Sequence, residues 1–338
     1  MKKESTQDVR LMYEAYPYPS PVAGDGLIRD IANMAALLFP SKFLEGKRIL
    51  DAGCGTGHRF LGFAKQFPKC SFLGIDMTTA SLNTARQLAE RHRITNARFQ
   101  QANLLDLDLA AEFDLIVSSG VINCLEDPDK GLANLCRCLA PGGHIILWHY
   151  HSYGEYSRLL DRELLLTFWD RDKMPFSEGI DIMQSLGISM SRERYSSVYA
   201  PRDNQVMDDV SMNVDGYLHP IVHTYRFDEA LDMLARCGMD WAAIHGVNLG
   251  RDSKLVDPDQ VSEPSIRMFC LKNGDLFKSP AIEERYRRLN SGDKLKVIEL
   301  ITRPNGFSLV AGKQDTYKLF DRRIQSGRVD FHRPDRMP

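Results

Sequence analysis

The sequence lacks an apolar run long enough to cross a bilayer, and its first residues, MKKESTQDVR, contain no apolar signal segment. It also lacks an excess of either charge, because 43 Lys and Arg residues stand against 45 Asp and Glu residues. A chain without a strong positive field is a poor non-specific binder of nucleic acid. We therefore expect a cytoplasmic protein that binds neither a membrane nor DNA or RNA.

Patterns typical of disulfide frameworks and zinc sites are also missing. The seven cysteines are an odd number and lie scattered in mostly apolar surroundings, as expected for reduced, buried thiols. Cys136 and Cys138 form a C-x-C pair, but no second Cys or His pair lies at zinc-like spacing. His219 and His223 are four positions apart, and Pro220 between them argues against a helix. We expect no metal site, and a structural or pocket-lining role for these histidines.

What the sequence does contain, from residue 48 to about residue 150, is a regular alternation of strand and helix patterns. Residues 47–53, 70–76, 97–103, 113–119 and 144–150 are predicted strands, and residues 58–67, 79–92 and 127–139 are predicted helices. Such alternation predicts an α/β fold with a doubly wound, mostly parallel sheet. Ligands of these sheets bind at the carboxyl ends of the strands.

The first predicted strand ends in the glycine-rich sequence DAGCGTG, residues 51–57. Glycines at alternate positions allow a tight turn close to a ligand, and the following helix presents free N–H groups. A nicotinamide dinucleotide is one candidate ligand. However, the third glycine of its G-x-G-x-x-G motif is replaced by His58, and Asp51 would repel a pyrophosphate. An acid beside the loop favours a ligand that carries an ammonium group.

The ends of the next two predicted strands indicate further parts of this ligand. Asp76 ends the second strand, where a carboxylate accepts hydrogen bonds from both hydroxyls of a ribose, and Met77 offers an apolar face to a purine. Asn103 and Leu104 end the third strand, where an amide oxygen is placed to accept a hydrogen bond from an adenine amino group. Ribose, adenine and an amino-acid tail together describe S-adenosylmethionine.

Residues 48–147 resemble a class I S-adenosylmethionine-dependent methyltransferase. The motifs are D-x-G-x-G-x-G after the first strand, an acid at the end of the second, and F-D-x-I-x-S-x-x-V-x-x-x-L-x-D-P followed by L-x-P-G-G before the fifth. The resemblance implies a seven-stranded sheet with an antiparallel last strand, and S-adenosylmethionine as cofactor. It implies these contacts: Asp51, Gly53 and Gly55 at the methionine end, Asp76 at the ribose, Asn103 and Leu104 at the adenine edge, and Ser119 and Gly120 at the sulfonium side.

The sequence departs from this family pattern at two places. Many relatives carry Asp where Asn103 stands, although the amide still supplies an acceptor, and many carry two histidines where Asn123 and Cys124 stand. Cys54, inside the glycine loop, is included among the cofactor-binding positions. A thiol at a helix N-terminus is a potential nucleophile, but small size alone explains Cys54, and methyl transfer needs no covalent intermediate.

The N-terminal sequence MYEAYPYPSP, residues 12–21, resembles that of a methyltransferase subgroup that begins with a tyrosine- and proline-rich segment. Its prolines make the segment stiff and extended. We expect Tyr13, Tyr16 and Tyr18 to help close the cofactor cleft, with one hydroxyl reaching the cofactor carboxylate or the methyl acceptor. The alternative is an arm that packs elsewhere on the core.

The end of the fifth strand supplies the other catalytic candidates. Strand alternation places His149 and His151 on one face and Tyr150 on the other. We expect one of these three side chains, or Tyr16, to act as a base or to orient the acceptor. The alternative for the histidines is a hydrogen-bonded structural role at the rim of the sheet.

The chain divides into five predicted segments: an N-terminal arm and helix (1–43), a cofactor-binding core (44–150), a helical insertion that covers the substrate (151–224), the remainder of the core (225–273) and a C-terminal extension (274–338). Residues 241–247 and 265–271 are the expected last strands. Residues 282–301 are expected to form one helix, docked on the core together with the apolar run at 306–312, and the Arg-rich tail to be loose.

The sequence thus predicts a methyltransferase that acts by in-line displacement. No Asn-Pro-Pro-Tyr stretch follows the fourth strand, which disfavours adenine or glutamine nitrogens as acceptors, and a small molecule or a peptide side chain is the expected acceptor. The alternatives are a non-catalytic S-adenosylmethionine sensor or scaffold and, less favoured, a NAD(P)-dependent oxidoreductase. A homodimer is compatible with this sequence.

Overall fold

The computed structural model describes residues 5–19, 25–39, 43–189, 210–249, 252–258, 269–313 and 328–330. Its first half contains α1 (Thr6–Ala15), α2 (Asp30–Leu38), β1 (Arg48–Ala52), α3 (His58–Gln66), β2 (Ser71–Asp76), α4 (Thr79–Arg91), β3 (Ala97–Gln101), η2 (Leu104–Asp106), β4 (Phe113–Ser119), η3 (Ile122–Cys124), α5 (Pro128–Arg137) and β5 (Leu139–Tyr150). The Arg-rich tail lies outside the described residues, apart from a short strand.

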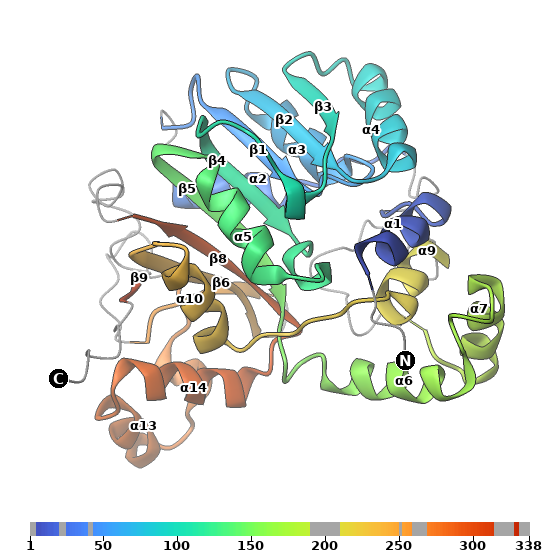
Figure 1. Ribbon diagram of the computed structural model, residues 1–338. Helices are drawn as coiled ribbons and strands as arrows, with labels where there is room; N and C mark the ends of the chain where they lie inside the picture. Colours follow the sequence, from blue (N-terminus) through green and yellow to red (C-terminus); the bar gives the residue numbers. More distant parts are fainter. Residues whose placement is uncertain are drawn as a thin grey trace.

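The second half begins with the insertion, which contains α6 (Tyr156–Phe168), α7 (Phe176–Ser185), α9 (Val210–Asn213) and the π-helical η4 (Val214–Leu218). It continues with α10 (Phe227–Arg236), β6 (Trp241–Leu249), β7 (Asp252–Val256), α12 (Asn273–Leu276), α13 (Pro280–Arg287), α14 (Ser291–Thr302), β8 (Gly306–Gly312) and β9 (Arg328–Asp330). Figure 1 shows α6, α7 and α9 beside α1, on one side of the central sheet.

One sheet organises the molecule. Its strand order is β3-β2-β1-β4-β5-β8-β6-β7, and β9 also pairs with β6. Strands β1 to β5 pair in parallel, whereas β8 runs antiparallel to both β5 and β6. The predicted doubly wound α/β fold is confirmed, and the sheet has eight strands along its path where seven were expected.

The strand between β5 and β6 comes from a segment that was not predicted to be a strand. The candidate strand at 265–271 lies mostly outside the described residues and stays a prediction. The apolar run 306–312 was expected to dock on the core, and it forms β8 within the sheet. Six of the seven residues of β8 are buried. A strand buried on both faces reads as a continuous apolar run, which periodicity does not distinguish from a docked segment.

The prediction of a single helix over residues 282–301 was also wrong. Two helices, α13 and α14, replace it, and the Asn290 side chain accepts a hydrogen bond of 2.8 Å from the backbone N–H of Asp293. This bond is the typical contact of an N-cap residue, so Asn290 begins a new helix where the apolar pattern alone continues the old one.

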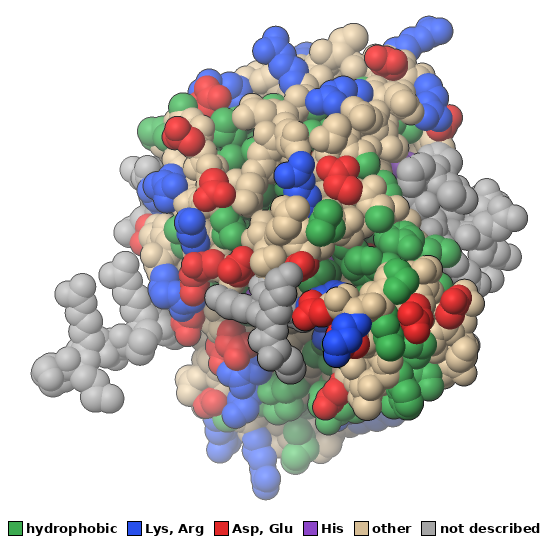
Figure 2. Space-filling model, turned by 45° about the vertical axis from the view of Figure 1, so that its right-hand side comes forward, with side chains coloured by type: hydrophobic (Ala, Val, Ile, Leu, Met, Phe, Trp, Pro, Cys, Tyr) green, Lys and Arg blue, Asp and Glu red, His purple; other side chains and the backbone are tan. Residues whose placement is uncertain are grey.

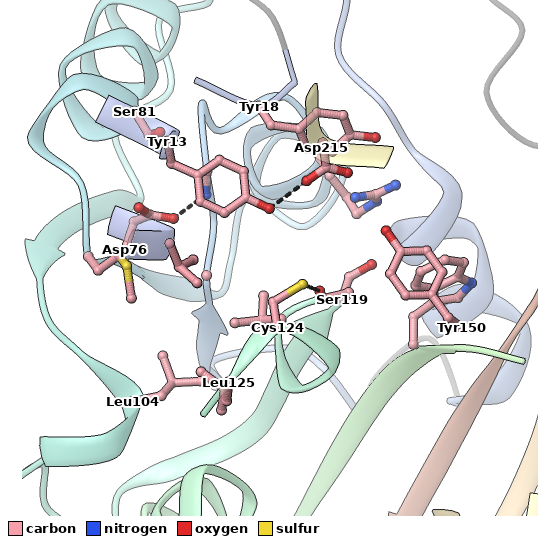
Figure 3. A pocket seen from close by; sticks show the side chains of 18 of the residues that line it. Tyr13, Tyr18, Asp76, Ser81, Leu104, Ser119, Cys124, Leu125, Tyr150 and Asp215 are labelled. Carbon is pink, nitrogen blue, oxygen red and sulfur yellow. Dashed lines mark hydrogen bonds between the residues drawn. The ribbon is translucent and has the colours of Figure 1, made fainter. Parts of the chain in front are cut away.

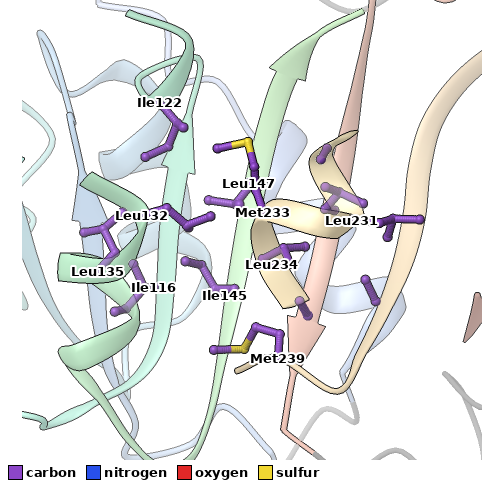
Figure 4. Close-up of a cluster of buried hydrophobic side chains, with 14 of the residues drawn as sticks. Ile116, Ile122, Leu132, Leu135, Ile145, Leu147, Leu231, Met233, Leu234 and Met239 are labelled. Atoms are coloured by element: carbon purple, nitrogen blue, oxygen red, sulfur yellow. The ribbon is translucent and has the colours of Figure 1, made fainter. Parts of the chain in front are cut away.

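Two apolar clusters cover opposite faces of the sheet. Along β1, Ile49 packs on one face and Leu50 on the other, as the alternation of strand side chains requires. Helices α5, α10 and α14 cover the face of Leu50, and α2, α3 and α4 cover the face of Ile49. Figure 4 shows the first cluster, where Leu132 and Leu135 of α5 meet the sheet beside Leu234 of α10. This packing fixes the strand ends that form the site.

A third apolar cluster joins the N-terminal arm to the insertion. Met12 of α1 is fully buried there, together with Leu165 and Trp169 of the α6 region and Tyr217 of η4. The arm is therefore part of the core of the insertion and not a loose leader. This position brings α1 to the carboxyl ends of the parallel strands.

Charged side chains of both signs are interspersed over the face of the molecule drawn in Figure 2. In the described part of the chain, no helix combines the length and the apolar character that crossing a membrane requires.

Candidate functional site

A cavity opens at the carboxyl ends of β1, β2, β4 and β5, where the sequence predicts the ligand (Figure 3). Its lining combines three parts of the chain. The N-terminal arm supplies Val9, Tyr13 and Tyr18, and the insertion supplies Met212 and Asp215. The strand ends and the segments that follow them supply Gly53, Gly55, Arg59, Asp76, Met77, Ser81, Ala102, Leu104, Ser119, Gly120, Val121, Cys124, Leu125, Trp148 and Tyr150. The arm and the insertion thus complete the wall of a cavity whose other side is formed at the strand ends of the sheet.

The glycine loop after β1 is held in a left-handed backbone conformation. Gly53 has φ +87° and Gly55 has φ +54°, values that favour glycine. A Cβ on Gly55 would lie 2.4 Å from the backbone oxygen of Tyr18, so this glycine allows the arm to rest directly on the loop. The backbone N–H of Thr56 donates to Tyr18 O at 3.2 Å, and its hydroxyl donates to Pro19 O at 2.8 Å. The tyrosine- and proline-rich segment therefore docks on the glycine loop.

Asp76, at the end of β2, is fixed by its neighbours on both sides. Its Oδ2 accepts a hydrogen bond from the backbone N–H of Gly55 at 3.0 Å, and its Oδ1 accepts from the N–H and hydroxyl of Thr78 at 2.9 and 2.8 Å. Burial raises the pKa of Asp76, and the hydrogen bonds from Thr78 and Gly55 oppose this rise. A carboxylate has about four acceptor positions, so Asp76 retains capacity toward the cavity.

Asp51 lies in the interior beside the loop and is not part of the cavity lining. Burial raises its pKa to about 7, while Arg59 lowers it and Asp76 and Asp30 raise it. Arg59 lines the cavity and forms an ion pair of 3.0 Å with Asp30. Sequence reasoning missed Arg59, although its place in the first turn of α3, next to the glycine loop, was an available signal.

The purine side of the predicted site is apolar. Met77, Leu104 and Leu125 line it, but Asn103 does not. The Asn103 side chain instead accepts from the backbone N–H of Leu105 at 3.1 Å and donates to Asp106 at 3.1 Å, which caps η2. Its amide is thus used within its own turn.

The end of β5 separates the catalytic candidates. Trp148 and Tyr150 line the cavity, whereas His149 and His151 point to the opposite face, as alternation predicts. Burial lowers the pKa of His149 to about 3, so this ring is neutral at physiological pH. Its Nδ1 lies 3.0 Å from Oδ1 of Asn123, whose Nδ2 is used as a donor to His223 O, so Nδ1 carries the proton.

His151 is also engaged away from the cavity. Its Nε2 lies 3.0 Å from Oε1 of Glu299 in α14, and both side chains are buried. Neither β5 histidine lines the cavity, and each has a ring nitrogen within hydrogen-bonding distance of a side chain elsewhere in the fold.

Of the remaining sequence candidates, Tyr18 lines the cavity and Tyr16 and His219 do not. Tyr18 lines the cavity, while Tyr16 packs edge-on against Phe176 of α7 at 5.8 Å. His219 Nδ1 accepts from the backbone N–H of Ile221, and its ring packs against Tyr13. No group of three or more His, Cys, Asp or Glu side chains suited to a metal ion occurs among the described residues.

The insertion contributes an acidic residue that the sequence did not single out. Asp215 of η4 accepts a hydrogen bond of 2.5 Å from the hydroxyl of Tyr13, and the two side chains point toward one another across the cavity wall in Figure 3. Burial raises the pKa of Asp215 to about 6, and the bond from Tyr13 and the charge of Arg158 oppose this rise. The segment before it contains several Asp residues, and nothing in their spacing marks the one that reaches the site.

Comparisons with known proteins agree with this geometry. A family model described as "Methyltransferase domain" matches residues 44–168. The chain is 35% identical over 193 residues to the uncharacterised protein syc1184_c of Synechococcus, which covers 54% of this chain and 46% of that protein. It is 33% identical over 241 residues to the uncharacterised protein RP028 of Rickettsia prowazekii, which covers 63% of this chain and 93% of that protein.

Among solved structures, the fold is similar to that of PKMT2 from Rickettsia typhi in complex with AdoHcy. The TM-score is 0.56 at 20% identity, over 89% of this chain and 54% of that chain. The chain thus spans about half the length of PKMT2 and of the Synechococcus protein. The chain belongs to the same family as RP028, and its residues 44–168 form a methyltransferase domain of the class I fold, whose cofactor is S-adenosylmethionine.

Proposed function

We propose that this protein transfers a methyl group from S-adenosylmethionine to a nitrogen or oxygen atom of a small molecule or a peptide side chain. The observation that carries the proposal is a single cavity that joins the glycine loop and Asp76 to an acidic and aromatic wall from the insertion. One end has the groups that suit the cofactor, and the other has side chains that suit an acceptor. A pure cofactor sensor needs only the first.

The residues of the first end fit the cofactor. Asp51 is a buried carboxylate with a raised pKa, and a cationic ammonium group beside it would favour its ionised form. We assign the methionine end to Gly53, Gly55 and Arg59, with Asp51 and Cys54 behind the cavity lining. We assign the ribose to Asp76, the purine to Met77 and Leu104, the sulfonium side to Ser119 and Gly120, and closure of the cleft to Tyr13 and Tyr18. Asn103 would contribute through its backbone, because its side chain caps η2.

The chain's own residues then hold the reactants in line. S-adenosylmethionine supplies an activated methyl group, so the protein has chiefly to align the acceptor and to remove a proton from it where necessary. Tyr150 lines the cavity from β5, beside Trp148, and would contact the acceptor. His149 and His151 would support the strand from its other face through Asn123 and Glu299.

Binding and transfer measurements test the proposal separately. Calorimetric titration with S-adenosylmethionine, S-adenosylhomocysteine and NAD should give binding of the first two and none of NAD. Tight NAD binding without a response to the others would contradict the proposal and favour an oxidoreductase. Radiolabelled methyl transfer into a cell lysate and a metabolite pool should label a specific product. Cofactor binding with no transfer in any fraction would favour the sensor or scaffold.

A further inference from the structure

Asp215 occupies an unusual position in the backbone. It lies in η4, a π-helical turn of Val214–Leu218 that directly follows α9. π-Helical turns are rare and occur frequently at functional sites, because they redirect one side chain out of the regular helical spacing. Here the carboxylate of Asp215, in such a turn, lines the cavity.

The two oxygens of Asp215 differ in their surroundings. Oδ1 accepts the hydrogen bond from Tyr13, whose own pKa is raised well above its ordinary value by burial and by the charge of Asp215, so the tyrosine keeps its proton and donates. Among the described residues, no hydrogen bond is made to Oδ2. A carboxylate that lines a cavity and has one oxygen already hydrogen-bonded is suited to bind a positively charged hydrogen-bond donor with its other oxygen.

The walls around Asp215 are aromatic. Tyr13, Trp148 and Tyr150 line the same cavity, and the rings of Trp148 and Tyr150 meet edge to face with centroids 4.9 Å apart. Aromatic faces attract cations, and the Tyr150 ring already has one cation near it outside the cavity lining, because the guanidinium of Arg158 lies 4.8 Å from its centroid.

Two arginines near the cavity each form an ion pair with another acid, although the charge of Arg158 also lowers the pKa of Asp215. Arg158 forms an ion pair with Glu155 and donates to the backbone oxygen of Gly216, and Arg59 pairs with Asp30. The lining includes no lysine. Asp215 would therefore repel an acceptor that carries a carboxylate at its reacting end, and the lining offers no lysine to offset that repulsion. It would attract an acceptor that carries an ammonium group there.

We propose that Asp215, oriented by Tyr13, binds the methyl acceptor as an amine that is positively charged at neutral pH and takes its proton before transfer. This inference rests on the proposed methyltransferase function. The proton moves from the acceptor nitrogen to Oδ2 of Asp215, and the electron pair of the broken N–H bond stays on nitrogen. The nitrogen uses that pair to form the bond to the methyl carbon, while the pair of the carbon–sulfur bond leaves with sulfur. The raised pKa of Asp215, about 6, makes it a stronger base than an ordinary aspartate, yet leaves it ionised at neutral pH.

A binding experiment tests the charge preference without turnover. Sinefungin carries an amine-bearing carbon in place of the methyl sulfonium, whereas S-adenosylhomocysteine has no group there. Asp215→Asn should weaken sinefungin binding by about 10- to 100-fold, as expected for a lost charge-assisted hydrogen bond, and change S-adenosylhomocysteine binding little. Tyr13→Phe, which keeps the ring, should give a smaller loss of the same kind, and Asp181→Asn, at an exposed position of α7, should give none. Equal affinity losses for both ligands, or none, would overturn the proposal.

A product analysis identifies the acceptor class. Tritiated methyl groups transferred into lysate fractions by the wild-type protein should appear in N-methylated amines that survive acid hydrolysis. A base-labile methyl ester or an O-methyl ether would overturn the amine assignment but leave the methyltransferase function intact. No transfer into any fraction, with S-adenosylhomocysteine still bound, would refute the proposed function itself and this inference with it.

Discussion

Glu14 of α1 caps the helix that begins at Thr79. Its carboxylate accepts hydrogen bonds from the backbone N–H groups of Thr79 and Ala80 at 2.9 and 3.1 Å. The N-cap residue of α4, Thr78, makes no capping bond of its own, because its hydroxyl donates to Asp76. The N-terminal arm thus caps α4, whose N-cap residue Thr78 donates hydrogen bonds to Asp76, the predicted ribose-binding carboxylate.

Loss of this cap should weaken both the fold and the site. We expect Glu14→Ala to lower the free energy of unfolding by about 1 kcal/mol, the usual value for a lost helix cap, and to weaken S-adenosylhomocysteine binding several-fold because Thr78 and Asp76 lose support. Urea denaturation and calorimetry measure the two effects. Glu45→Ala is the matched control, since its ion pair with Lys69 is exposed. Equal behaviour of the two variants would argue against the coupling of arm and site.

Removal of the Asp76 carboxylate should affect the cofactor most directly. We expect Asp76→Ala to weaken S-adenosylhomocysteine binding by about 1 to 3 kcal/mol, because it removes a charged acceptor and frees the N–H of Gly55 from its partner. Asp76→Asn should lose less, since one oxygen remains. Asp108→Ala, at an exposed position, serves as the calorimetric control. Unchanged affinity in Asp76→Ala would contradict the ribose assignment.

Local features of the site could be predicted from the sequence, because they depend on neighbours along the chain. The glycine loop and Asp76 lie within 25 positions of each other and face the cavity together. Alternation along β5 also separated Tyr150 from His149 and His151, but it did not tell which face meets the cavity. These features follow from strand geometry and from the backbone freedom of glycine, both of which the sequence encodes locally.

Features that depend on distant partners could not be predicted. Tyr13 meets Asp215 across 202 positions, and His151 meets Glu299 across 148. Alternation gives the face on which a histidine lies but not its partner, so a catalytic and a structural histidine look alike in sequence. Deleting the N-terminal arm would not isolate a role in closing the cleft, because Met12 is fully buried in the core of the insertion.

The contact of arm and loop can be tested with two glycines. Gly55 and Gly142 have φ values of +54° and +76°, so alanine at either position is strained by about 1 kcal/mol. Only at Gly55 does a Cβ meet a neighbour, Tyr18 O at 2.4 Å, whereas nothing lies within 4 Å at Gly142. We expect Gly55→Ala to displace the arm and weaken S-adenosylhomocysteine binding, and Gly142→Ala to alter stability alone. Similar binding by both variants would show that the arm does not shape the site.

The raised pKa of Asp51 predicts an unusual dependence of stability on pH. Burial raises this pKa from 3.8 to about 7, so between these values the folded protein binds more protons at this group than the unfolded chain. The contribution of Asp51 to the free energy of unfolding therefore falls as pH rises from about 4 to 7 and stays low above that. Asp51→Asn removes this loss, because asparagine does not ionise.

The ligand-free Asp51→Asn variant should then be more stable than the wild type at about pH 8, on the order of 2 kcal/mol, and nearly equal to it at about pH 4.5. Urea denaturation across this range measures the difference in the free energy of unfolding between variant and wild type. The other titrating groups are the same in both proteins, so their contributions cancel in this difference. The same substitution should reduce the stabilisation that S-adenosylhomocysteine gives, because an ammonium group beside an ionised carboxylate offsets the burial of its charge. If the variant is less stable than the wild type at the higher pH, groups within the protein already stabilise the ionised carboxylate of Asp51. Asp51 would then not need the ammonium group of a ligand to stabilise its charge.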